Sequence, residues 1–384
     1  MASSRTVLRR PVESASQSSQ SGSSRWFSSS NLAIMFGRPL ILASAPLVHQ
    51  GSLSILNTLL VCSSLAVSAA GAQEPAETSL ARTYHYDQWD VFTDEPLTGN
   101  QLAVFMEPQG LTTDLMQSIA REMSFSETTF IFPPDDEDAD FRVRIFGPNW
   151  ELPFAGHPTI GTAFALARAG AIAPGTAQVV FSEGIGPVIV ELEWNGDGLR
   201  FAWMHDITPK FGKTLQNVNS MAVALGVKPS ELKSTLLPVQ EVSGGASFLF
   251  IPLTSRAVVD RARLNTSAIS TVLQKAGLAK QSVFMFSTEP TDDGATVYGR
   301  KLGLDGREDP ATGSAAGPLG CYLVRYGVAR GKESASILIR QGVQMGRPSW
   351  LHVQLGLSGN EITDVRVGGS SVFIGDGTIM LPDD

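Results

Sequence analysis

The sequence contains an internal repeat, and this repeat constrains the fold more than any other feature. Residues 151–170 align without gaps with residues 308–327, and six of the twenty positions are identical. Each copy holds a loop with Pro and Gly, then a segment with helical spacing, then a Gly suited to end a helix. The identical pairs are Glu151 and Glu308, Pro153 and Pro310, Gly156 and Gly313, Leu166 and Leu323, Arg168 and Arg325, and Gly170 and Gly327.

The segments that follow the two copies also agree. A strand, a Gly-rich turn and a second strand come next, over residues 178–194 in one copy and 336–355 in the other. This pattern predicts a duplicated α/β unit, with the join near residues 203–211. Two similar halves leave one cleft between them, and this cleft is the expected place for a ligand.

The first 72 residues differ in composition from the rest of the chain. Residues 1–34 are rich in Ser and Arg, which suits an organelle transit peptide or a start codon assigned too early. An apolar run at 53–68, followed by Ala70-Gly71-Ala72, predicts a secretory signal that is removed after Ala72. Asn57 and several Ser interrupt the run, so no stable membrane span is expected. The predicted location is exported or periplasmic, and cytoplasmic if the start site is wrong.

Charge and cysteine content exclude several classes of function. The chain carries a formal charge of −8, and residues 1–72 carry +4, so the other 312 residues carry −12. An acidic body without a Lys or Arg cluster excludes nucleic acid as a partner. Cys321 is the only Cys of that body, so it has no intramolecular disulfide and no pair of catalytic thiols. No Cys and His spacing suits a metal, and Cys321 aligns with Phe164 within the repeat, which predicts core packing.

The segment before the repeat predicts a mixed α/β arrangement. A helix is expected to begin at Thr112 or Thr113, because apolar residues recur after it at helical spacing. Strands are expected at residues 88–92, 101–105, 126–132 and 139–147.

Glu127 is the first candidate for proton chemistry. It is the only acid between Met123 and Phe132, and it lies at the entry of an apolar strand. A carboxyl group among apolar neighbours has a raised pKa, so it can take and return a proton near neutral pH. A solvated surface Glu is the alternative interpretation.

In each repeat copy a loop leads directly into a helix, as Gly156-His157-Pro158-Thr159 and as Thr312-Gly313-Ser314-Ala315. Pro158 suits a first helical position and Ser314 suits an N-cap. The free N–H groups of a helix start favour an anion, so two starts at one cleft would hold a carboxylate. The alternative is that both are ordinary capped helices, with His157 in a structural hydrogen bond.

At these residues the sequence resembles the phenazine-biosynthesis PhzF-like isomerase family, over about residues 84–382. The motifs that carry the resemblance are Asp90-Val-Phe-Thr93, Gly99-Asn100, Leu102-Ala-Val-Phe105, Ser126-Glu-Thr-Thr-Phe130, Glu151-Leu-Pro-Phe-Ala-Gly-His-Pro-Thr159, Glu308-Asp-Pro-Ala-Thr-Gly-Ser-Ala315, Gln341-Gly342 and Gly346-Arg-Pro-Ser349.

The resemblance implies an α/β (α+β) fold of the diaminopimelate-epimerase type. Two pseudo-symmetric halves would each be a curled, mainly antiparallel sheet around a central helix. It further implies an active site between the halves, no cofactor, no metal and a homodimer. After a leader at 1–72 and a linker at 73–83, the halves would span 84–203 and 204–364, and strands at 365–384 would return to the first half.

The resemblance also implies the site residues. Epimerases of this superfamily use two Cys, but this chain has Ala155 and Ala311 at those positions, so it is similar to the members in which a single Glu moves a proton. That residue would be Glu127, with His157 and Asp309 in support. The implied substrate-binding residues are Ser126, Gly156, Pro158, Thr159, Gly313, Ser314 and Ala315.

The sequence therefore predicts a cofactor-independent isomerase acting on a small carboxylate-bearing substrate with an acidic C–H. The family's reaction on a dihydro-hydroxyanthranilate is one candidate. Gln101 and the loop Gly147-Pro-Asn-Trp150 depart from the family pattern, and Trp150 would reshape the pocket. One alternative is an epimerase or racemase with a second base that is not a thiol. The other is a protein of the same fold that binds small molecules without catalysis.

Overall fold

The computed structural model describes residues 82–135, 137–359 and 361–382. The predicted leader, its cleavage site and nearly all of the linker lie outside the described residues. Within the described residues, no helix is both long and apolar enough to cross a membrane.

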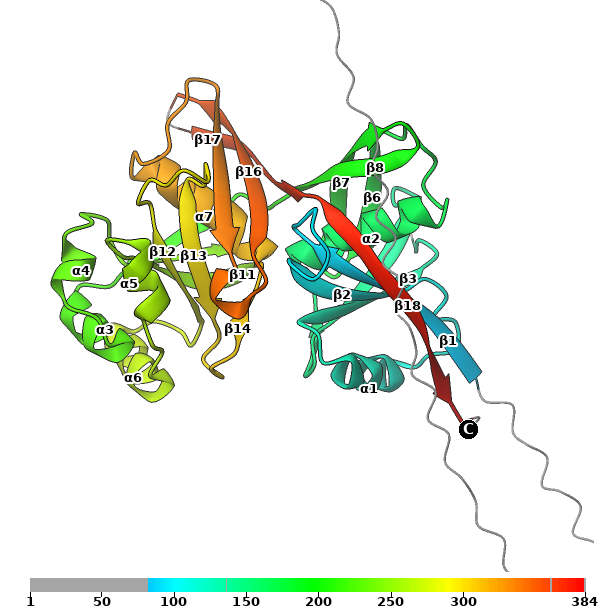
Figure 1. The fold of residues 1–384 in the computed structure, drawn as a ribbon, viewed down its shortest axis with the longest axis horizontal. Coiled ribbons are helices and arrows are strands. Elements are labelled where there is room, and N and C mark those ends of the chain that lie inside the picture. The colour runs from blue at the N-terminus through cyan, green and yellow to red at the C-terminus, as the bar shows by residue number, and fades with distance from the viewer. Residues whose placement is uncertain (1–81, 136, 360, 383–384) are drawn as a thin grey trace, which may run out of the picture. The chain divides into compact units, whose positions relative to one another are not determined.

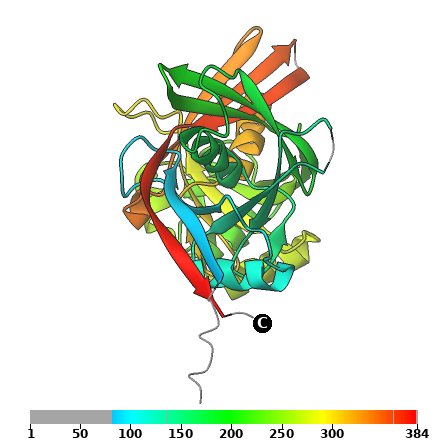
Figure 2. The same ribbon diagram turned by 90° about the vertical axis from the view of Figure 1, so that its right-hand side faces the viewer.

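The first half is a sheet that surrounds one helix (Figures 1 and 2). β1 is antiparallel to β2, β2 is parallel to β3, and β3 is antiparallel to β4. β4 is antiparallel to β5 and parallel to β6, and β6, β7 and β8 follow as an antiparallel series. The elements are β1 (Arg82–Val91), β2 (Asn100–Phe105), α1 (Thr113–Met123), β3 (Glu127–Phe132), β4 (Phe141–Phe146), β5 (Glu151–Leu152), α2 (Gly156–Arg168), β6 (Gln178–Glu183), β7 (Gly186–Asn195) and β8 (Gly198–His205).

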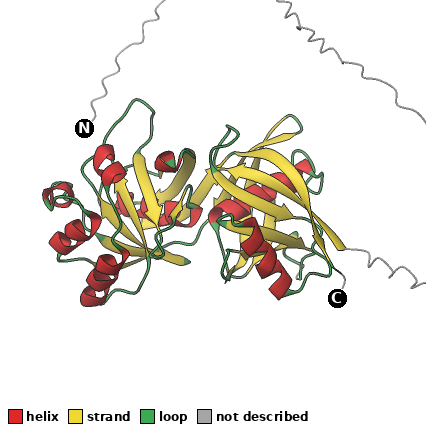
Figure 3. Cartoon of the chain, turned by 60° about the horizontal axis from the view of Figure 1, so that its bottom comes forward, coloured by secondary structure: helices red, strands yellow, loops and turns green. Residues whose placement is uncertain are grey.

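The second half repeats this topology. β10 to β17 pair in the same order and with the same directions as β1 to β8. Helices α3 to α6 lie on its outer side, at the left of Figure 3, over a separate apolar core. The elements are β9 (Lys210–Thr214), α3 (Val218–Leu225), α4 (Ser230–Lys233), β10 (Gln240–Gly244), β11 (Ala246–Pro252), α5 (Arg256–Arg261), α6 (Thr266–Ala276), β12 (Ser282–Ser287), β13 (Val297–Leu302), β14 (Glu308–Asp309), α7 (Gly313–Arg325), β15 (Ser334–Gln341), η1 (Val343–Met345), β16 (Ser349–Ser358), β17 (Glu361–Gly369) and β18 (Ser371–Leu381).

The duplication predicted from the sequence is confirmed by the two central helices. α2 and α7 begin at Gly156 and Gly313, at the two aligned glycines of the repeat. Both helices end in the same motif, in which Gly170 (φ 75°) and Gly327 (φ 68°) adopt the left-handed conformation. The residue after each glycine donates to a carbonyl five residues earlier, which satisfies the last turn.

The halves exchange one strand each. β9 follows β8 but pairs with β10 of the second half, and β18 follows β17 but pairs with β1 of the first half. β8 and β17 are themselves antiparallel neighbours, with Arg366 opposite His205. β8 extends to His205 and β17 to Gly369. The chain therefore passes from one half to the other a few residues after the expected boundaries at 203 and 364. The reason is that β8 and β17 need these residues to pair with each other.

Each central helix is buried on all sides, as expected for a helix that is apolar around its whole circumference. Residues 156–166 of α2 are buried without exception, and α2 contacts β1, β2 and β8. Gly161 permits the approach to the sheet, because a Cβ there would lie 2.6 Å from Leu102 Cδ2 and 2.7 Å from Val91 Cγ2. In α7, Cys321 is fully buried in the same core, which confirms its predicted packing role.

Candidate active site

The starts of α2 and α7 meet at Gly156 and Gly313. A Cβ built on Gly156 would lie 2.6 Å from the Cα of Gly313, and a Cβ on Gly313 would lie 2.8 Å from the Cα of Gly156. Real Cβ atoms do not approach backbone this closely, so only glycine fits at either position. Two helix starts with unpaired N–H groups therefore share one place, which is a favourable setting for an anion.

The helix starts differ from the sequence prediction by two positions each. Ala155 and Thr312 are the N-cap residues, so Pro158 is the third helical residue of α2 and Ser314 the second of α7. Pro158 is tolerated because the N–H groups of a first turn have no intrahelical partner. Ser314 does not cap the helix because the cap position belongs to Thr312, and its half-buried side chain lies in the first turn.

Glu127 is the first residue of β3, and its carboxyl lies next to His157. The Oε2 atom of Glu127 is 3.5 Å from Nδ1 of His157, and the Glu127 side chain keeps 20% exposure while that of His157 keeps 4%. The pKa of Glu127 is raised to about 8, mainly by burial and also by the negative charge of Asp309, while the positive charge of Lys301 opposes the rise. Glu127 is therefore mostly a protonated acid at neutral pH.

His157 is neutral in this environment. Burial is the main cause that lowers the pKa of the His157 imidazole to about 4, so the ring carries no charge near neutral pH. Its Nδ1 also lies 3.2 Å from the Asn100 amide nitrogen. The buried Nε2 has no hydrogen-bond partner among the described residues.

Asp309 receives hydrogen bonds from both halves of the molecule. Its Oδ1 accepts from Asn100 Nδ2 at 2.8 Å and from Ser126 Oγ at 3.0 Å, and its Oδ2 accepts from Thr312 Oγ1 at 2.5 Å. The Asn100 amide also donates to the carbonyl of Ala311 at 2.9 Å. These bonds satisfy the carboxylate without a cation and fix its position beside the helix starts.

Asn100 and Gln341 are site residues that the sequence analysis did not select. Asn100 begins β2, is 1% exposed, and contacts Asp309 and His157. Gln341 is fully buried; its Oε1 accepts from the Thr312 N–H at 3.2 Å, and its Nε2 donates to the Asp309 carbonyl at 2.8 Å. Both lie in motifs of the family pattern, which was the available signal.

The remaining predicted substrate-binding residues have different environments. Ser126 lies beside Glu127 and donates to Asp309. Thr159 is buried, and its hydroxyl lies 2.7 Å from Glu183 Oε1, so it is occupied within the protein. Ala315 is fully buried in the core. Among the predicted set, the structure brings together Glu127, His157, Asp309, Ser126, Gly156, Gly313 and Ser314 near the helix starts, whereas the hydroxyl of Thr159 and the side chain of Ala315 point to internal partners.

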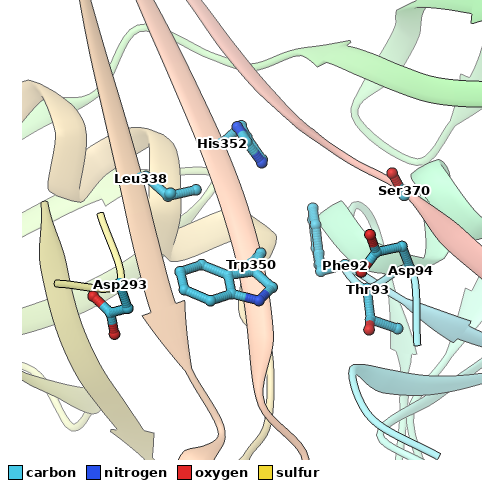
Figure 4. A pocket seen from close by; sticks show the side chains of 8 residues that line it. All are labelled: Phe92, Thr93, Asp94, Asp293, Leu338, Trp350, His352 and Ser370. Carbon is cyan, nitrogen blue, oxygen red and sulfur yellow. The ribbon is translucent and has the colours of Figure 1, made fainter. Parts of the chain in front are cut away.

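A separate pocket of about 310 Å³ lies between the loop after β1 and strands β15 and β16 (Figure 4). It contains none of the predicted site residues. In this pocket Asp293 forms ion pairs with Arg256 and Arg340 at 2.6 Å each, and these partners hold the pKa of the Asp293 carboxyl well below its usual range. Burial lowers the pKa of His352. Glu127, with its raised pKa beside two helix starts, is the better candidate for proton transfer. The pocket is lined by Phe92, Thr93, Asp94, Asp293, Leu338, Trp350, His352 and Ser370.

The described residues include no group of three or more His, Cys, Asp or Glu side chains placed to hold a metal ion. The polar groups at the site are instead satisfied by one another, through Asn100, Ser126 and Thr312.

Comparison with known proteins identifies relatives along the whole described body. An uncharacterized isomerase of Mesorhizobium japonicum is 36% identical over 306 residues, covering 78% of this chain and all of the relative. A trans-2,3-dihydro-3-hydroxyanthranilate isomerase of Pseudomonas chlororaphis is 34% identical over 298 residues, again 78% of this chain and all of the relative. The shared length indicates a common fold.

Solved structures of related proteins have the same fold. A PhzF-family phenazine biosynthesis protein of Bacillus anthracis matches with a TM-score of 0.71 and 25% identity, covering 78% of this chain and all of that one. A hydroxyproline epimerase of Agrobacterium vitis shares the fold, with a TM-score of 0.55, 14% identity, and coverage of 79% and 94%. These matches confirm the predicted epimerase-like fold class.

The family model described as phenazine biosynthesis-like protein matches residues 89–377, which is most of the chain and all of the site described above. The chain is therefore a member of the phenazine biosynthesis-like (PhzC-PhzF) family, and it is an isomerase.

Proposed function

We propose that this isomerase moves a proton on a small carboxylate-bearing substrate, with Glu127 as the single proton carrier. The observation that carries the proposal is the partly buried Glu127 carboxyl, with a pKa of about 8, beside the two helix starts at Gly156 and Gly313. The helix starts supply N–H groups for the substrate carboxylate. The carboxyl supplies a proton acceptor and donor in the same cleft.

The reaction takes two proton transfers. The Glu127 carboxylate takes a proton from a carbon next to an electron-withdrawing group of the substrate, and the C–H electron pair shifts the double bond. The protonated Glu127 then gives that proton to another carbon on the same face, which regenerates the carboxylate. No proton is gained or lost overall, so product and substrate are isomers.

The raised pKa suits both transfers. At pH 7 about one Glu127 in ten is ionised, since the pKa is about 8, and this fraction can accept the proton. Burial then stabilises the neutral acid, so the proton stays on Glu127 until the substrate takes it back. His157 is neutral, and its Nδ1 can donate to the Glu127 carboxylate in one tautomer or accept from the protonated acid in the other. Asp309 keeps Ser126 and Asn100 in place.

The test is turnover of a panel of small carboxylates by Glu127→Gln, followed by NMR in heavy water. The panel includes trans-2,3-dihydro-3-hydroxyanthranilate, the substrate named for a relative. Loss of a positioned acid or base typically costs 10²- to 10⁴-fold, so a loss of about that size is expected. The matched control is Glu122→Gln, an exposed glutamate on α1, which should keep wild-type turnover. Unchanged turnover in Glu127→Gln would overturn the mechanism.

The same experiment separates two other activities. A shifted double bond indicates isomerisation, whereas deuterium incorporation with loss of optical activity indicates an epimerase or racemase with a second base. Ligand binding without turnover by the wild type indicates a binding protein of the same fold.

Two further properties are proposed for this protein from its sequence. We expect export with cleavage after Ala72, which N-terminal sequencing of the mature protein tests, and retention in the cytoplasm would contradict it. We expect a homodimer, which light scattering on a sizing column tests, and a monomer mass would contradict that.

A further inference from the structure

Strand β13 carries a lysine where the duplicated framework has an apolar residue. In each half an arginine on the central strand pairs with the glutamate of the short strand beside it: Arg144 with Glu151 at 2.7 Å, and Arg300 with Glu308 at 2.7 Å. The residue after each arginine faces the residue after each glutamate. In the first half that pair is Ile145 and Leu152, and in the second half it is Lys301 and Asp309. The framework is thus repeated, but both members of this opposed pair have changed from apolar to charged.

Lys301 and Asp309 lie on the same face of the sheet, since directly opposed residues of antiparallel strands share a face. Asp309 is satisfied by Asn100, Ser126 and Thr312 and needs no cation. Among the described residues, no side chain forms a hydrogen bond or an ion pair with the Lys301 ammonium. Lys301 is nevertheless half-buried.

The other partly buried cations in this part of the molecule are paired. Arg300 binds Glu308, Arg347 binds Asp90, and Arg256 binds Asp293. A cation withdrawn from water without a partner is costly, so it is kept where a ligand supplies the anion.

The charge of Lys301 acts on two groups of the candidate site. It lowers the pKa of the Glu127 carboxyl and also that of the His157 imidazole. At neutral pH, Glu127 is mostly protonated and His157 is neutral, so Lys301 and Asp309 are the principal charged groups of the cluster. The hydrogen bonds to Asp309 leave Lys301 as a positive charge available to a ligand.

We propose that Lys301 binds a second carboxylate of the substrate, so that this enzyme prefers small dicarboxylates to monocarboxylates. The first carboxylate occupies the helix starts, where the N–H groups of α2 and α7 converge. The second lies on the Asp309 side of the cleft, against the Lys301 ammonium. This inference rests on the proposed function, because it places the ligand in the same cleft.

The test is the affinity of the full chain for matched pairs of unreactive ligands, measured by isothermal titration calorimetry. The pairs are isophthalate with benzoate, and glutarate with butyrate. A charge-assisted hydrogen bond in a partly buried site is worth a factor of about ten or more in affinity. We therefore expect at least one dicarboxylate to bind about tenfold tighter than its monocarboxylate partner.

Three variants attribute that preference to Lys301. Lys301→Met should bring the ratio of affinities close to one, and Lys301→Arg should retain most of it. Lys332→Met, at an exposed lysine, should leave the ratio unchanged. A circular dichroism melt of each variant verifies that it is folded. The proposal is overturned if Lys301→Met keeps the tenfold ratio, if the wild type shows no preference, or if neither member of either pair binds at millimolar concentration.

Glu127→Gln separates this inference from the proposed function. If Glu127→Gln abolishes turnover while Lys301→Met leaves the ratio unchanged, the proton-transfer mechanism stands and the role of Lys301 is wrong. If Glu127→Gln keeps full turnover while the ratio depends on Lys301, the dicarboxylate site stands and the mechanism is wrong.

Discussion

Replacing Gly156 by Ala tests whether the meeting of the two helix starts matters for activity. The added Cβ would lie 2.6 Å from the Cα of Gly313, 2.8 Å from its carbonyl carbon and 3.0 Å from the nitrogen of Ser314. Ordinary contacts of a Cβ begin at 3.4 Å, so the two helix starts must separate by about 0.8 Å. All three neighbours are backbone atoms, so no side-chain rotation can relieve the clash.

The displacement predicts effects on both activity and stability. A misplacement of about 1 Å in a catalytic arrangement can reduce the rate by about 10²-fold, so kcat/KM should fall by a factor of that order. Overpacking typically costs about 1–3 kcal/mol of unfolding free energy, partly offset because Ala favours helix more than Gly does. Activity on the best substrate of the panel and urea unfolding measure the two effects.

The control for this substitution is Gly375→Ala. Gly375 lies in β18 and has no positive φ, and an added Cβ there would have no atom within 4 Å, so the same chemical change meets open space. It should leave kcat/KM unchanged. Wild-type kcat/KM in Gly156→Ala would refute the argument that the close approach of the helix starts builds the anion site.

Three further outcomes are expected. The kcat/KM of the wild type should rise with pH with a midpoint near pH 8, because the ionised form of Glu127 accepts the proton and its pKa is about 8. A midpoint near pH 4.5 would contradict this. Asn100→Ala should lower kcat/KM by about tenfold to a hundredfold while changing the melting temperature only slightly. The reason is that Asp309 loses a hydrogen-bond donor from the other half of the molecule. Unchanged kinetics would show that this bond is dispensable. Burial raises the pKa of Glu183 to about 8. Its contribution to stability is therefore complete below about pH 4.5 and is lost as the pH rises through about 8. In urea titrations, the unfolding free energy of Glu183→Gln should accordingly increase relative to that of the wild type between pH 5 and 8. A constant difference across that range would show that Glu183 does not titrate as described.

Much of the fold was predictable from local patterns. The two central helices begin at the aligned glycines of the repeat and end at Gly170 and Gly327, because a left-handed glycine is a local requirement of a helix end. The helix that follows Thr112 is also as predicted, since the Thr112 side chain accepts from the N–H of Leu115. The predicted starts of these helices were less accurate, because Pro158 and Ser314 are permitted at several first-turn positions.

Part of the site was not predictable, because it depends on contacts between distant segments. Asn100 has little signal of its own, and its role arises from acceptors on Asp309 and Ala311, about 210 residues away. Gln341 likewise acts through Thr312 and the carbonyl of Asp309. The pairing of β8 with β17 also leaves no local pattern, which is why the chain crosses between the halves a few residues later than the expected boundaries.

The sequence by itself determined the duplication, the order of elements, the absence of a thiol pair in the body and the candidacy of Glu127. These follow from residue identity and spacing, which act over a few positions of the chain. Only the tertiary structure decided that Gly156 meets Gly313, that Asp309 is held from both halves, and that Lys301 lies opposite Asp309 without a partner among the described residues. The pKa of Glu127 belongs to this second group, because burial and the distances between charges are set by how the two halves pack together.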